Sequence, residues 1–283
     1  MPDKPKSFSY SKVSTFDTCK YKYKLRYIDH LKVKPNLDPD NSLYEGTACH
    51  VGIQTRSIEE AIKSYSSNYP YLTNLNNIEI LKLKEILPKA IQSVPEGEYE
   101  YKLSGNDGFV GYIDCLVKNE DGTYDILDFK YSNNSGKYKK SGQVHLYKFY
   151  FELLTKKKVK NLYYVLIPKY KDLEVTSEMS DEEVLEKIKS YFRDKDVTFE
   201  RVLYDPQKIE YFFQKKRLMD EEKTFEKSPS KLCAWCDYYK YCTTNGQDRS
   251  EILEVANDTL VEELPEEKTE PTTTVEIEET CLF

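Results

Sequence analysis

Two neighbouring segments, residues 109–117 and 124–131, are rich in β-branched and aromatic residues and are joined by a short loop with an Asp-Gly turn signal. This pattern predicts a β-hairpin. Side chains alternate between the two faces of a strand, so Asp128 and Lys130 point the same way, and a suitable register brings Asp114 beside them. Two carboxylates that face one point repel each other unless a cation lies between them. Hard divalent metals such as Mg²⁺ accept such a shell, and a nearby ammonium can orient a water molecule.

The same charges could also form the solvent-facing side of an ordinary hairpin, because protein surfaces consist of such residues. The rest of the chain favours a functional site, since four short motifs follow one another along it. They are GxxxH at residues 46–50, GxxD at 111–114, DxK at 128–130 and QxxxY at 143–147. Four such motifs in this order are difficult to obtain by chance.

In order and residue types, these motifs resemble RecB-type nucleases of the PD-(D/E)XK superfamily, in particular the branch with an iron–sulfur cluster that includes the CRISPR-associated RecB-like exonucleases and the AddB nuclease domain. The resemblance extends from about Phe8 to Cys242, and its first part, which contains Cys19, is similar to the family's first helix. It implies an α/β fold, namely a restriction-endonuclease-like core with a central mixed β-sheet flanked by helices and closed by a four-cysteine cluster. One departure is Asp128, because other branches carry Glu there.

The resemblance also implies roles for individual residues. Lys130 would position or activate the attacking water. Gln143 and Tyr147 would support the site and touch DNA, and their spacing of four places both on one face of a helix. The catalytic Mg²⁺ or Mn²⁺ ion would be held by a set of four implied ligands. These are His50, Asp114, Asp128 and the carbonyl of Phe129.

The chain has only three histidines. His50 follows a run of small residues that lets a backbone or a metal approach closely, which favours it as a ligand. His30 and His145 lack such neighbours. We interpret His30 as a helix-end residue and His145 as a residue near the DNA, and neither as a ligand.

Three of the seven cysteines form a C-x2-C-x5-C pattern at residues 233–242, a spacing that suits a metal. Both a structural zinc and an iron–sulfur cluster would need a fourth thiolate, and the spacing alone leaves the two equally open. The resemblance favours a [4Fe–4S] cluster. Cys49 and Cys115 adjoin His50 and Asp114, and we expect both to be structural core thiols. The four expected cluster ligands are Cys19, Cys233, Cys236 and Cys242.

A disulfide framework is the alternative use of these cysteines, and the sequence context opposes it. The first residues contain no apolar signal region, and no segment approaches 18 uninterrupted apolar residues. We therefore expect a soluble intracellular protein, cytoplasmic and in the host cytoplasm if phage-encoded, without a membrane partner.

A pass along the chain predicts strands that alternate with helices, and hence a mixed sheet with a right-handed crossover. The expected helices cover residues 11–28, 44–65, 77–93, 139–154, 181–193 and 206–225. The expected strands cover residues 99–103, 109–117, 124–130 and 162–168.

The net charge of −7 is distributed unevenly. Residues 246–283 carry twelve acidic residues and two basic ones, a net charge of −10, so residues 1–245 carry +3. We expect residues 1–245 to form the nuclease domain and 246–283 a disordered acidic tail. Lysine clusters interleaved with tyrosines could line a phosphate track with stacking platforms. They lie at residues 20–26, 137–140, 156–160 and 215–217.

The tail ends in Leu282 and Phe283 after acidic residues, and Cys281 belongs to the same segment. This ending resembles the peptides that dock replication proteins onto sliding clamps and the Phe-terminated tails of single-strand binding proteins. The alternative is an arbitrary terminus kept soluble by charge. An apolar pair on a flexible arm is nevertheless a suitable tether to a sliding clamp or another replication protein.

These features predict a metal-dependent DNA exonuclease that prefers single-stranded or frayed ends and acts in replication, recombination or phage genome processing. The chain has no phosphate-binding loop of the GxxxxGK[S/T] type and hence no ATP-driven motor of its own. Two alternatives stay open, a CRISPR adaptation nuclease and a catalytically inactive DNA-binding adaptor. The abundance of Lys, Asn and Tyr also fits a phage or another AT-rich genome.

Overall fold

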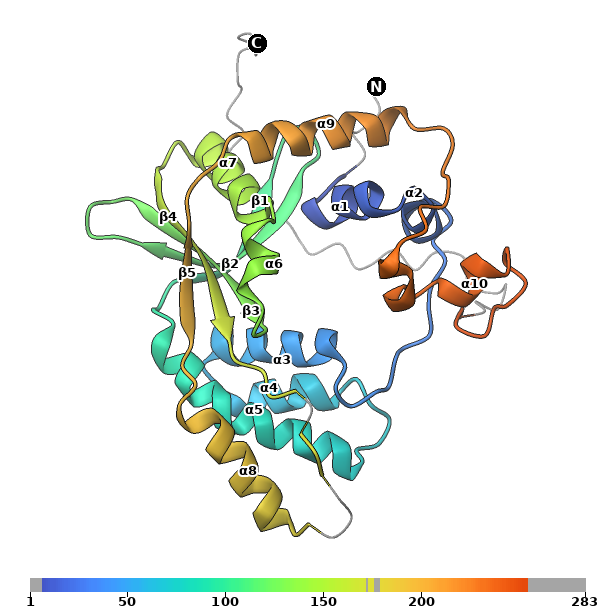
Figure 1. Cartoon of the computed structure of the whole chain (residues 1–283). Helices are drawn as coiled ribbons and strands as arrows, with labels where there is room; N and C mark the ends of the chain where they lie inside the picture. Colours follow the sequence, from blue (N-terminus) through green and yellow to red (C-terminus); the bar gives the residue numbers. More distant parts are fainter. Residues whose placement is uncertain (1–6, 172, 176–178, 254–283) are drawn as a thin grey trace.

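A five-stranded mixed β-sheet forms the centre of the computed structural model, which describes residues 7–171, 173–175 and 179–253 (Figure 1). The strands follow one another in chain order across the sheet, and all neighbours are antiparallel except β3 and β4. This confirms the predicted mixed sheet, although β5 was not predicted. The strands are β1 (Glu98–Ser104), β2 (Val110–Lys118), β3 (Tyr124–Tyr131), β4 (Val159–Ile167) and β5 (Thr198–Val202).

Helices cover both faces of the sheet. On one face, α1, α7 and α9 pack against apolar side chains such as Ile113 and Ile126. On the other face, α3, α5 and α8 pack against Cys115, Leu127 and Phe129. The helical elements are α1 (Tyr10–Thr18), α2 (Lys20–Tyr23), the π-helix η1 (Lys24–Ile28), α3 (Ser42–Thr55), α4 (Ile58–Ser66), α5 (Asn74–Ser93), α6 (Ser135–Lys139), α7 (Gln143–Thr155), α8 (Asp181–Arg193), α9 (Gln207–Glu221), the 3₁₀ helix η2 (Lys231–Trp235) and α10 (Tyr239–Thr243).

Two expected helices are interrupted at residues that cap the neighbouring helices, and a third begins later than expected. The helix expected at 11–28 breaks at Cys19, whose backbone is extended. The helix expected at 44–65 breaks at Arg56, which has a φ of +51°, and Ser57 caps the next helix. The helix expected at 139–154 begins only at Gln143.

The first helices pack against the last described residues. Leu25, Tyr238 and Ile252 form a small apolar cluster, and Val33 forms a β-bridge with Ile252. We expected the domain to end at residue 245, but Ile252 is buried, so the packed chain continues to Leu253. The predictions for the tail, including Cys281, Leu282 and Phe283, lie outside the described residues.

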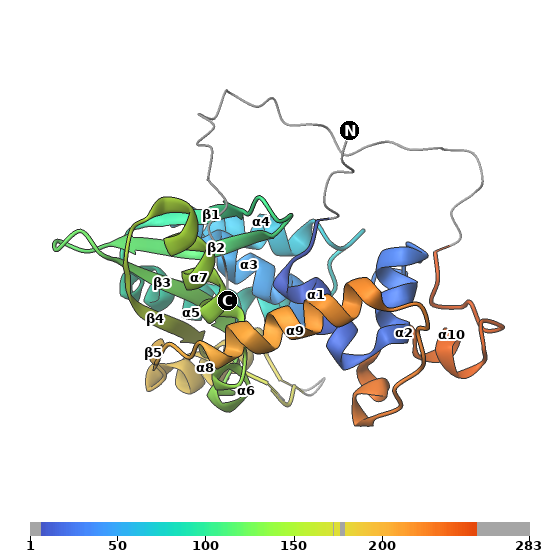
Figure 2. The ribbon, with the colours of Figure 1, turned by 90° about the horizontal axis from the view of Figure 1, so that it is seen from above.

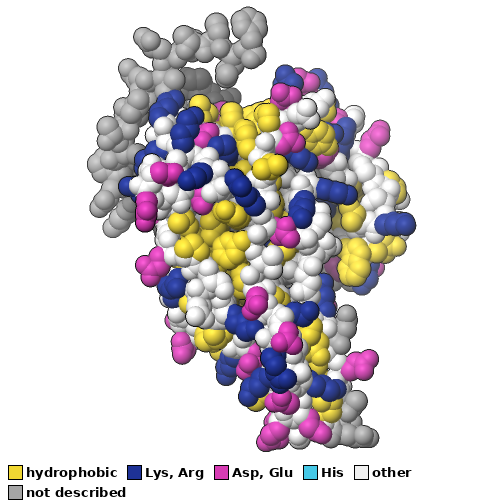
Figure 3. All heavy atoms as spheres, turned by 60° about the vertical axis from the view of Figure 1, so that its left-hand side comes forward, with side chains coloured by type: hydrophobic (Ala, Val, Ile, Leu, Met, Phe, Trp, Pro, Cys, Tyr) yellow, Lys and Arg dark blue, Asp and Glu magenta, His cyan; other side chains and the backbone are white. Residues whose placement is uncertain are grey.

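Acidic and basic side chains are interspersed on the face that Figure 3 shows, around a central group of apolar side chains. Basic side chains therefore form no uniform stripe on that face. A search of the described residues for a helix with the length and apolar character of a membrane span finds none.

Candidate metal centre

The register of the β2–β3 pair brings the two central motifs together. Cys115 lies opposite Leu127, so Asp114 and Asp128 occupy the next position of the two strands. The backbone N–H of Phe129 donates a hydrogen bond of 2.6 Å to Oδ2 of Asp114, which fixes that carboxylate beside β3. The structure thus places Asp114 and Asp128 as the sequence predicts.

Helix α3 supplies His50 to the same place. Its Nε2 lies 3.0 Å from the carbonyl oxygen of Phe129, and its Nδ1 lies 3.7 Å from Oδ2 of Asp114. Burial lowers the pKa of His50. The imidazole is therefore neutral at neutral pH and can offer a nitrogen lone pair to a cation.

Asp128 is fully buried, with 0 % of its surface exposed. It forms an ion pair with Lys130 through Oδ2, and among the described residues neither oxygen has a hydrogen-bond partner other than that lysine. Burial raises the pKa of Asp114, and the nearby charge of Asp128 raises it further. Two ionised carboxylates buried this close together destabilise the folded protein unless a cation lies between them.

These residues fit a hard divalent cation. Carboxylate and carbonyl oxygens are the ligands that Mg²⁺ prefers, and bonds of about 2.1 Å at right angles separate neighbouring ligand atoms by about 3 Å. The 3.0 Å between His50 Nε2 and the Phe129 oxygen is a hydrogen bond in this structure, and the same distance is compatible with that separation. The buried carboxylate of Asp128 supplies negative charge.

Lys130 lies beside the carboxylates and between two aromatic rings. Its Nζ is 5.7 Å from the ring centre of Tyr138 and 5.9 Å from that of Tyr164. Burial acts to lower the pKa of Lys130, but Asp128 and Asp114 outweigh it, so the pKa is raised. The side chain is therefore an ammonium held in a fixed direction.

Gln143 and Tyr147 lie on one face of α7, as their spacing predicts. Gln143 Nε2 donates a hydrogen bond of 2.8 Å to the hydroxyl of Tyr147, and Asp128 contributes, after burial, to raising the pKa of that hydroxyl. Gly111 lets this ring approach the sheet. A Cβ at Gly111 would lie 2.9 Å from the Phe109 ring and 3.1 Å from the Tyr147 ring, which explains the glycine of the GxxD motif.

Glu100 is a candidate site residue that the sequence did not reveal. Its carboxylate and ligand atoms of His50 and Asp114 all lie within 4.8 Å of one another. Glu100 stands opposite Asp114 in the register of β1 and β2, and its backbone is left-handed with a φ of +51°. Tyr99 and Tyr101 pack on opposite faces of the sheet, so the alternation of side chains changes phase at Glu100. A strict alternation of side chains along β1 would not predict that the Glu100 carboxylate points toward His50 and Asp114.

We expect Glu100→Gln to weaken binding of Mn²⁺ by about tenfold or more, because the charge and number of oxygen ligands set the affinity of such sites. Isothermal titration with Mn²⁺ measures this effect without DNA. Glu98→Gln is the matched control, since Glu98 is an exposed carboxylate of the same strand that is not grouped with His50. Equal affinities of the Glu100 and Glu98 variants would remove Glu100 from the ligand set.

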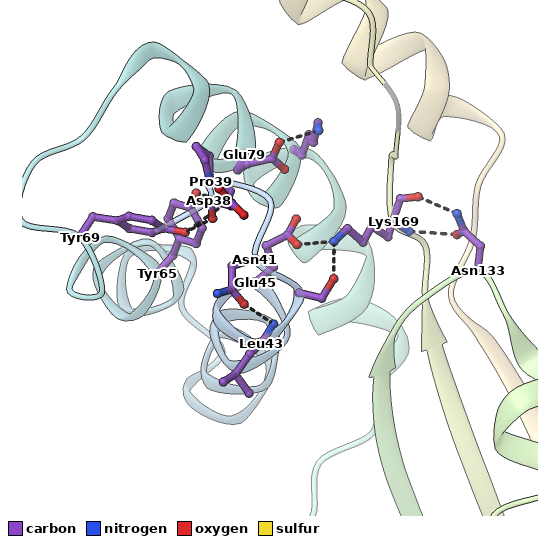
Figure 4. A network of polar contacts seen from close by, with 12 residues as sticks. Asp38, Pro39, Asn41, Leu43, Glu45, Tyr65, Tyr69, Glu79, Asn133 and Lys169 are labelled. Atoms are coloured by element: carbon purple, nitrogen blue, oxygen red, sulfur yellow. Dashed lines mark hydrogen bonds and ion pairs between the residues drawn. The ribbon is translucent and has the colours of Figure 1, made fainter. Parts of the chain in front are cut away.

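A buried polar network holds the first turn of α3, which precedes His50 (Figure 4). Lys169, in the segment after β4, pairs with Glu45 of α3 and lies 3.1 Å from Oγ of Ser42. Asn133 binds the backbone of Lys169 through two hydrogen bonds of 2.6 and 3.0 Å. The network therefore fixes α3 relative to the ends of β3 and β4, where the metal centre lies.

We expect Lys169→Met to lower the free energy of unfolding by about 3 kcal/mol near neutral pH, because it leaves Glu45 buried without its partner. Burial already raises the pKa of Glu45 to about 8. Lys169 lowers that pKa, so in the variant it rises further. A protonated Glu45 is tolerated, so stability is retained at acidic pH and is lost as the pH rises. Urea unfolding at pH 5 and pH 8 measures the difference, with the exposed Lys171→Met as control. A smaller loss at pH 8 than at pH 5 would contradict this.

The four cysteines of the expected cluster lie around one cavity of about 320 Å³, which includes Cys19 from the break between α1 and α2. Two sulfurs already accept backbone hydrogen bonds, Cys19 from Lys22 at 3.4 Å and Cys233 from Ser230 at 3.3 Å. The structure thus brings Cys19 together with the three cysteines near the end of the domain, as the sequence predicts.

Of the remaining predictions for cysteines and histidines, some agree with the structure and one does not. Cys49 and Cys115 are fully buried, as expected of core thiols. The expectation that His145 lies near the DNA is wrong, because the side chain is buried and its Nδ1 accepts a hydrogen bond of 3.1 Å from the backbone of Asp205. His30 follows η1 with a φ of +49°, which agrees with a helix-end residue.

A mixed five-stranded sheet with helices on both faces, and with an acidic cluster and a lysine on adjacent strands, defines a restriction-endonuclease-like fold. The chain belongs to the PD-(D/E)XK nuclease superfamily, whose sequence profile matches residues 7–243. Membership implies a metal-dependent nuclease hydrolase with DNA as its substrate. A comparison with curated proteins finds no match. The solved structure titled "Crystal structure of SSO0001" is similar over 83% of this chain and 96% of that chain, with 12% identity and a TM-score of 0.31, too low to support an argument.

Proposed function

We propose that the protein is a RecB-type DNA exonuclease that carries a [4Fe–4S] cluster and acts on single-stranded or frayed ends. The observation that carries the proposal is the fully buried carboxylate of Asp128, which is paired with the ammonium of Lys130 and lies beside Asp114 and His50. A catalytically inactive adaptor would have no need to maintain this costly arrangement.

The residues of the centre divide the work of hydrolysis. A divalent cation held by the candidate ligands would supply Lewis-acid polarisation of the scissile phosphate. Lys130, already protonated, donates hydrogen bonds that orient a water or neutralise a phosphate oxygen, and does not act as a base. Tyr147, oriented by Gln143, lies at the edge of the site, where a hydroxyl can contact the substrate.

The GxxxH glycine supports binding of a substrate over α3. Gly46 lies one turn before His50, and no atom lies within 4 Å of the position that its Cβ would take. A glycine inside a helix costs about 1 kcal/mol relative to alanine, and the described structure gives no packing reason for it. Close approach of a DNA backbone over this helix would explain the residue.

The arrangement of the thiols supports an iron–sulfur cluster rather than zinc. Four sulfurs bound to one zinc at about 2.3 Å would lie about 3.8 Å apart. Within the described part of the chain, the four cysteines are not among the groups of three ligand atoms that lie within 4.8 Å of one another, and they line one cavity of about 320 Å³. A cavity of this size supports a larger group such as a [4Fe–4S] cube. Three further points stay predictions from the sequence. They are the docking of a replication protein on Leu282 and Phe283, a phage origin, and a role in replication or recombination.

Digestion of end-labelled DNA tests the function. We expect linear single strands to be degraded from an end in the presence of Mg²⁺ or Mn²⁺, blunt duplexes to be degraded more slowly, and circular single strands to resist. Cleavage of circles as fast as linear strands would replace the exonuclease by an endonuclease. Absence of cleavage with either metal, in protein with a full cluster, would refute the proposed function.

A further inference from the structure

Trp235 is the only tryptophan of the chain, and it lies almost entirely in solvent, with 85% of its surface exposed. It belongs to η2, between Cys233 and Cys236. Leu232 and Tyr239 nearby are 61% and 47% exposed. We name these three side chains the Trp235 surface. An exposed apolar group of this size commonly marks a binding site.

The backbone that presents Trp235 is well held. The N–H of Cys233 donates to the carbonyl of Ser230 at 3.0 Å, and the N–H of Cys236 donates to the carbonyl of Cys233 at 3.1 Å. Tyr238 anchors the segment from below, because its ring is buried and its hydroxyl donates to the carbonyl of Leu31 at 2.8 Å. The indole is therefore exposed on a folded turn rather than on a loose loop.

Basic side chains surround the Trp235 surface. Lys22 and Lys227 line the same cavity as Leu232 and Tyr239, and Lys231 lies next to Leu232 in η2. Lys22 forms an ion pair of 3.3 Å with Asp237, and Nζ of Lys227 donates hydrogen bonds of 2.5 and 2.6 Å to the carbonyl of Cys242 and the side chain of Asn245. Lys231 has no acidic partner among the ion pairs of the described residues. A flat apolar surface with a cationic rim is complementary to a nucleobase and its flanking phosphates.

The position of this surface also fits the metal centre. In Figure 2, α6 and the orange segment before α10, which contains η2, both lie along the lower edge of the view. Helix α6 follows β3, the strand of Asp128 and Lys130, and it carries Lys137 and Lys139. A strand that leaves the metal centre over α6 and continues along this edge would come to the Trp235 surface.

We propose that the Trp235 surface stacks a base of the single-stranded part of the DNA substrate, while the surrounding lysines contact its phosphates. This inference rests on the proposed function. Stacking on an indole accepts every base, because each has a π face. The bases of an intact duplex are already paired and stacked, so the surface acts only on single strands and frayed ends. It would be one origin of the proposed preference for such ends.

Two measurements in the presence of EDTA, which prevents cleavage, test this inference with the full chain. Saturation with an oligo-dT strand is expected to change the emission of Trp235, which as the only tryptophan reports contact directly. In fluorescence anisotropy with a labelled oligo-dT strand, Trp235→Ala is expected to bind about tenfold more weakly, and Trp235→Phe nearly as tightly as the natural chain. Tyr71→Ala is the matched control, since Tyr71 is 75% exposed and lies outside the Trp235 surface.

Binding of oligo-dT without any change in tryptophan emission, or equal affinity of Trp235→Ala and Tyr71→Ala, would overturn the inference and leave the proposed nuclease intact. A natural chain that neither binds nor cleaves DNA would instead overturn the proposed function. Because the side chain is exposed, we expect Trp235→Ala to keep its fold, and an unchanged melting temperature confirms this.

Discussion

Asp128→Asn is expected to lower the rate of DNA cleavage by about a thousandfold or more, since the loss of a metal-binding charge removes several kcal/mol of transition-state stabilisation. The neutral amide removes the repulsion from Asp114, and its oxygen can still accept a hydrogen bond from Lys130. The melting temperature of the metal-free protein should therefore change little. Cleavage assays and thermal melts with and without Mn²⁺ measure both effects, and the stabilisation by Mn²⁺ should disappear.

Asp125, on the same strand, provides a control, because its replacement should lower stability without lowering the cleavage rate. Its carboxylate accepts hydrogen bonds from Asn119 and from the backbone and side chain of Asn161. Asp125→Asn should therefore cost about 1–2 kcal/mol of stability and leave the cleavage rate of the folded protein unchanged. If the Asp128→Asn variant cleaves DNA at a rate within tenfold of that of the natural chain, Asp128 is not an active-site residue.

The second large effect concerns the four cysteines around the cavity. Anaerobically purified protein should be brown and contain about four irons per chain. Replacing Cys19, Cys233, Cys236 or Cys242 by Ser should remove most of the iron and the soluble protein. Metal–thiolate binding contributes about 10 kcal/mol or more to folding in small metal sites, which is comparable with the whole stability of a domain.

Cys281→Ser is the control for the cysteine series, because Cys281 lies in the acidic tail by sequence and outside the proposed cluster. It should leave iron content and yield unchanged. One zinc and no iron in colourless protein would contradict the cluster and leave a structural zinc as its replacement.

The elements that the sequence predicted well are those whose signals are local. The hairpin of β2 and β3 follows from its alternation and its Asp-Gly turn, and α8 has the predicted bounds because Ser180 and Glu183 form a capping box at its start. The predicted juxtaposition of Asp114 and Asp128 needed only a pairing of two adjacent strands.

The features that the sequence did not reveal depend on distant contacts or on local irregularity. Glu100 joins the metal centre because the alternation of side chains along β1 changes phase at this residue, whose backbone is left-handed. A left-handed position is usually indicated by a glycine in the sequence, and this position is not a glycine. Strand β5 is short and half exposed, so its apolar pattern is weak. The burial of His145 depends on a hydrogen bond from Asp205, which is 60 residues away in the chain.

The contact between the first helices and the last described residues has a consequence for biosynthesis. The backbone N–H of Tyr21 bonds to Glu226, and Lys34 bonds to Glu251, across roughly two hundred residues. A ribosome that adds about 5–20 residues per second needs about 10–40 s to produce those partners. During that time α1 can dock on the segment around Phe109, but the contacts of Tyr21 and Lys34 and the site of Cys19 stay incomplete. This end of the domain can therefore close only after nearly all of the described chain has been synthesised.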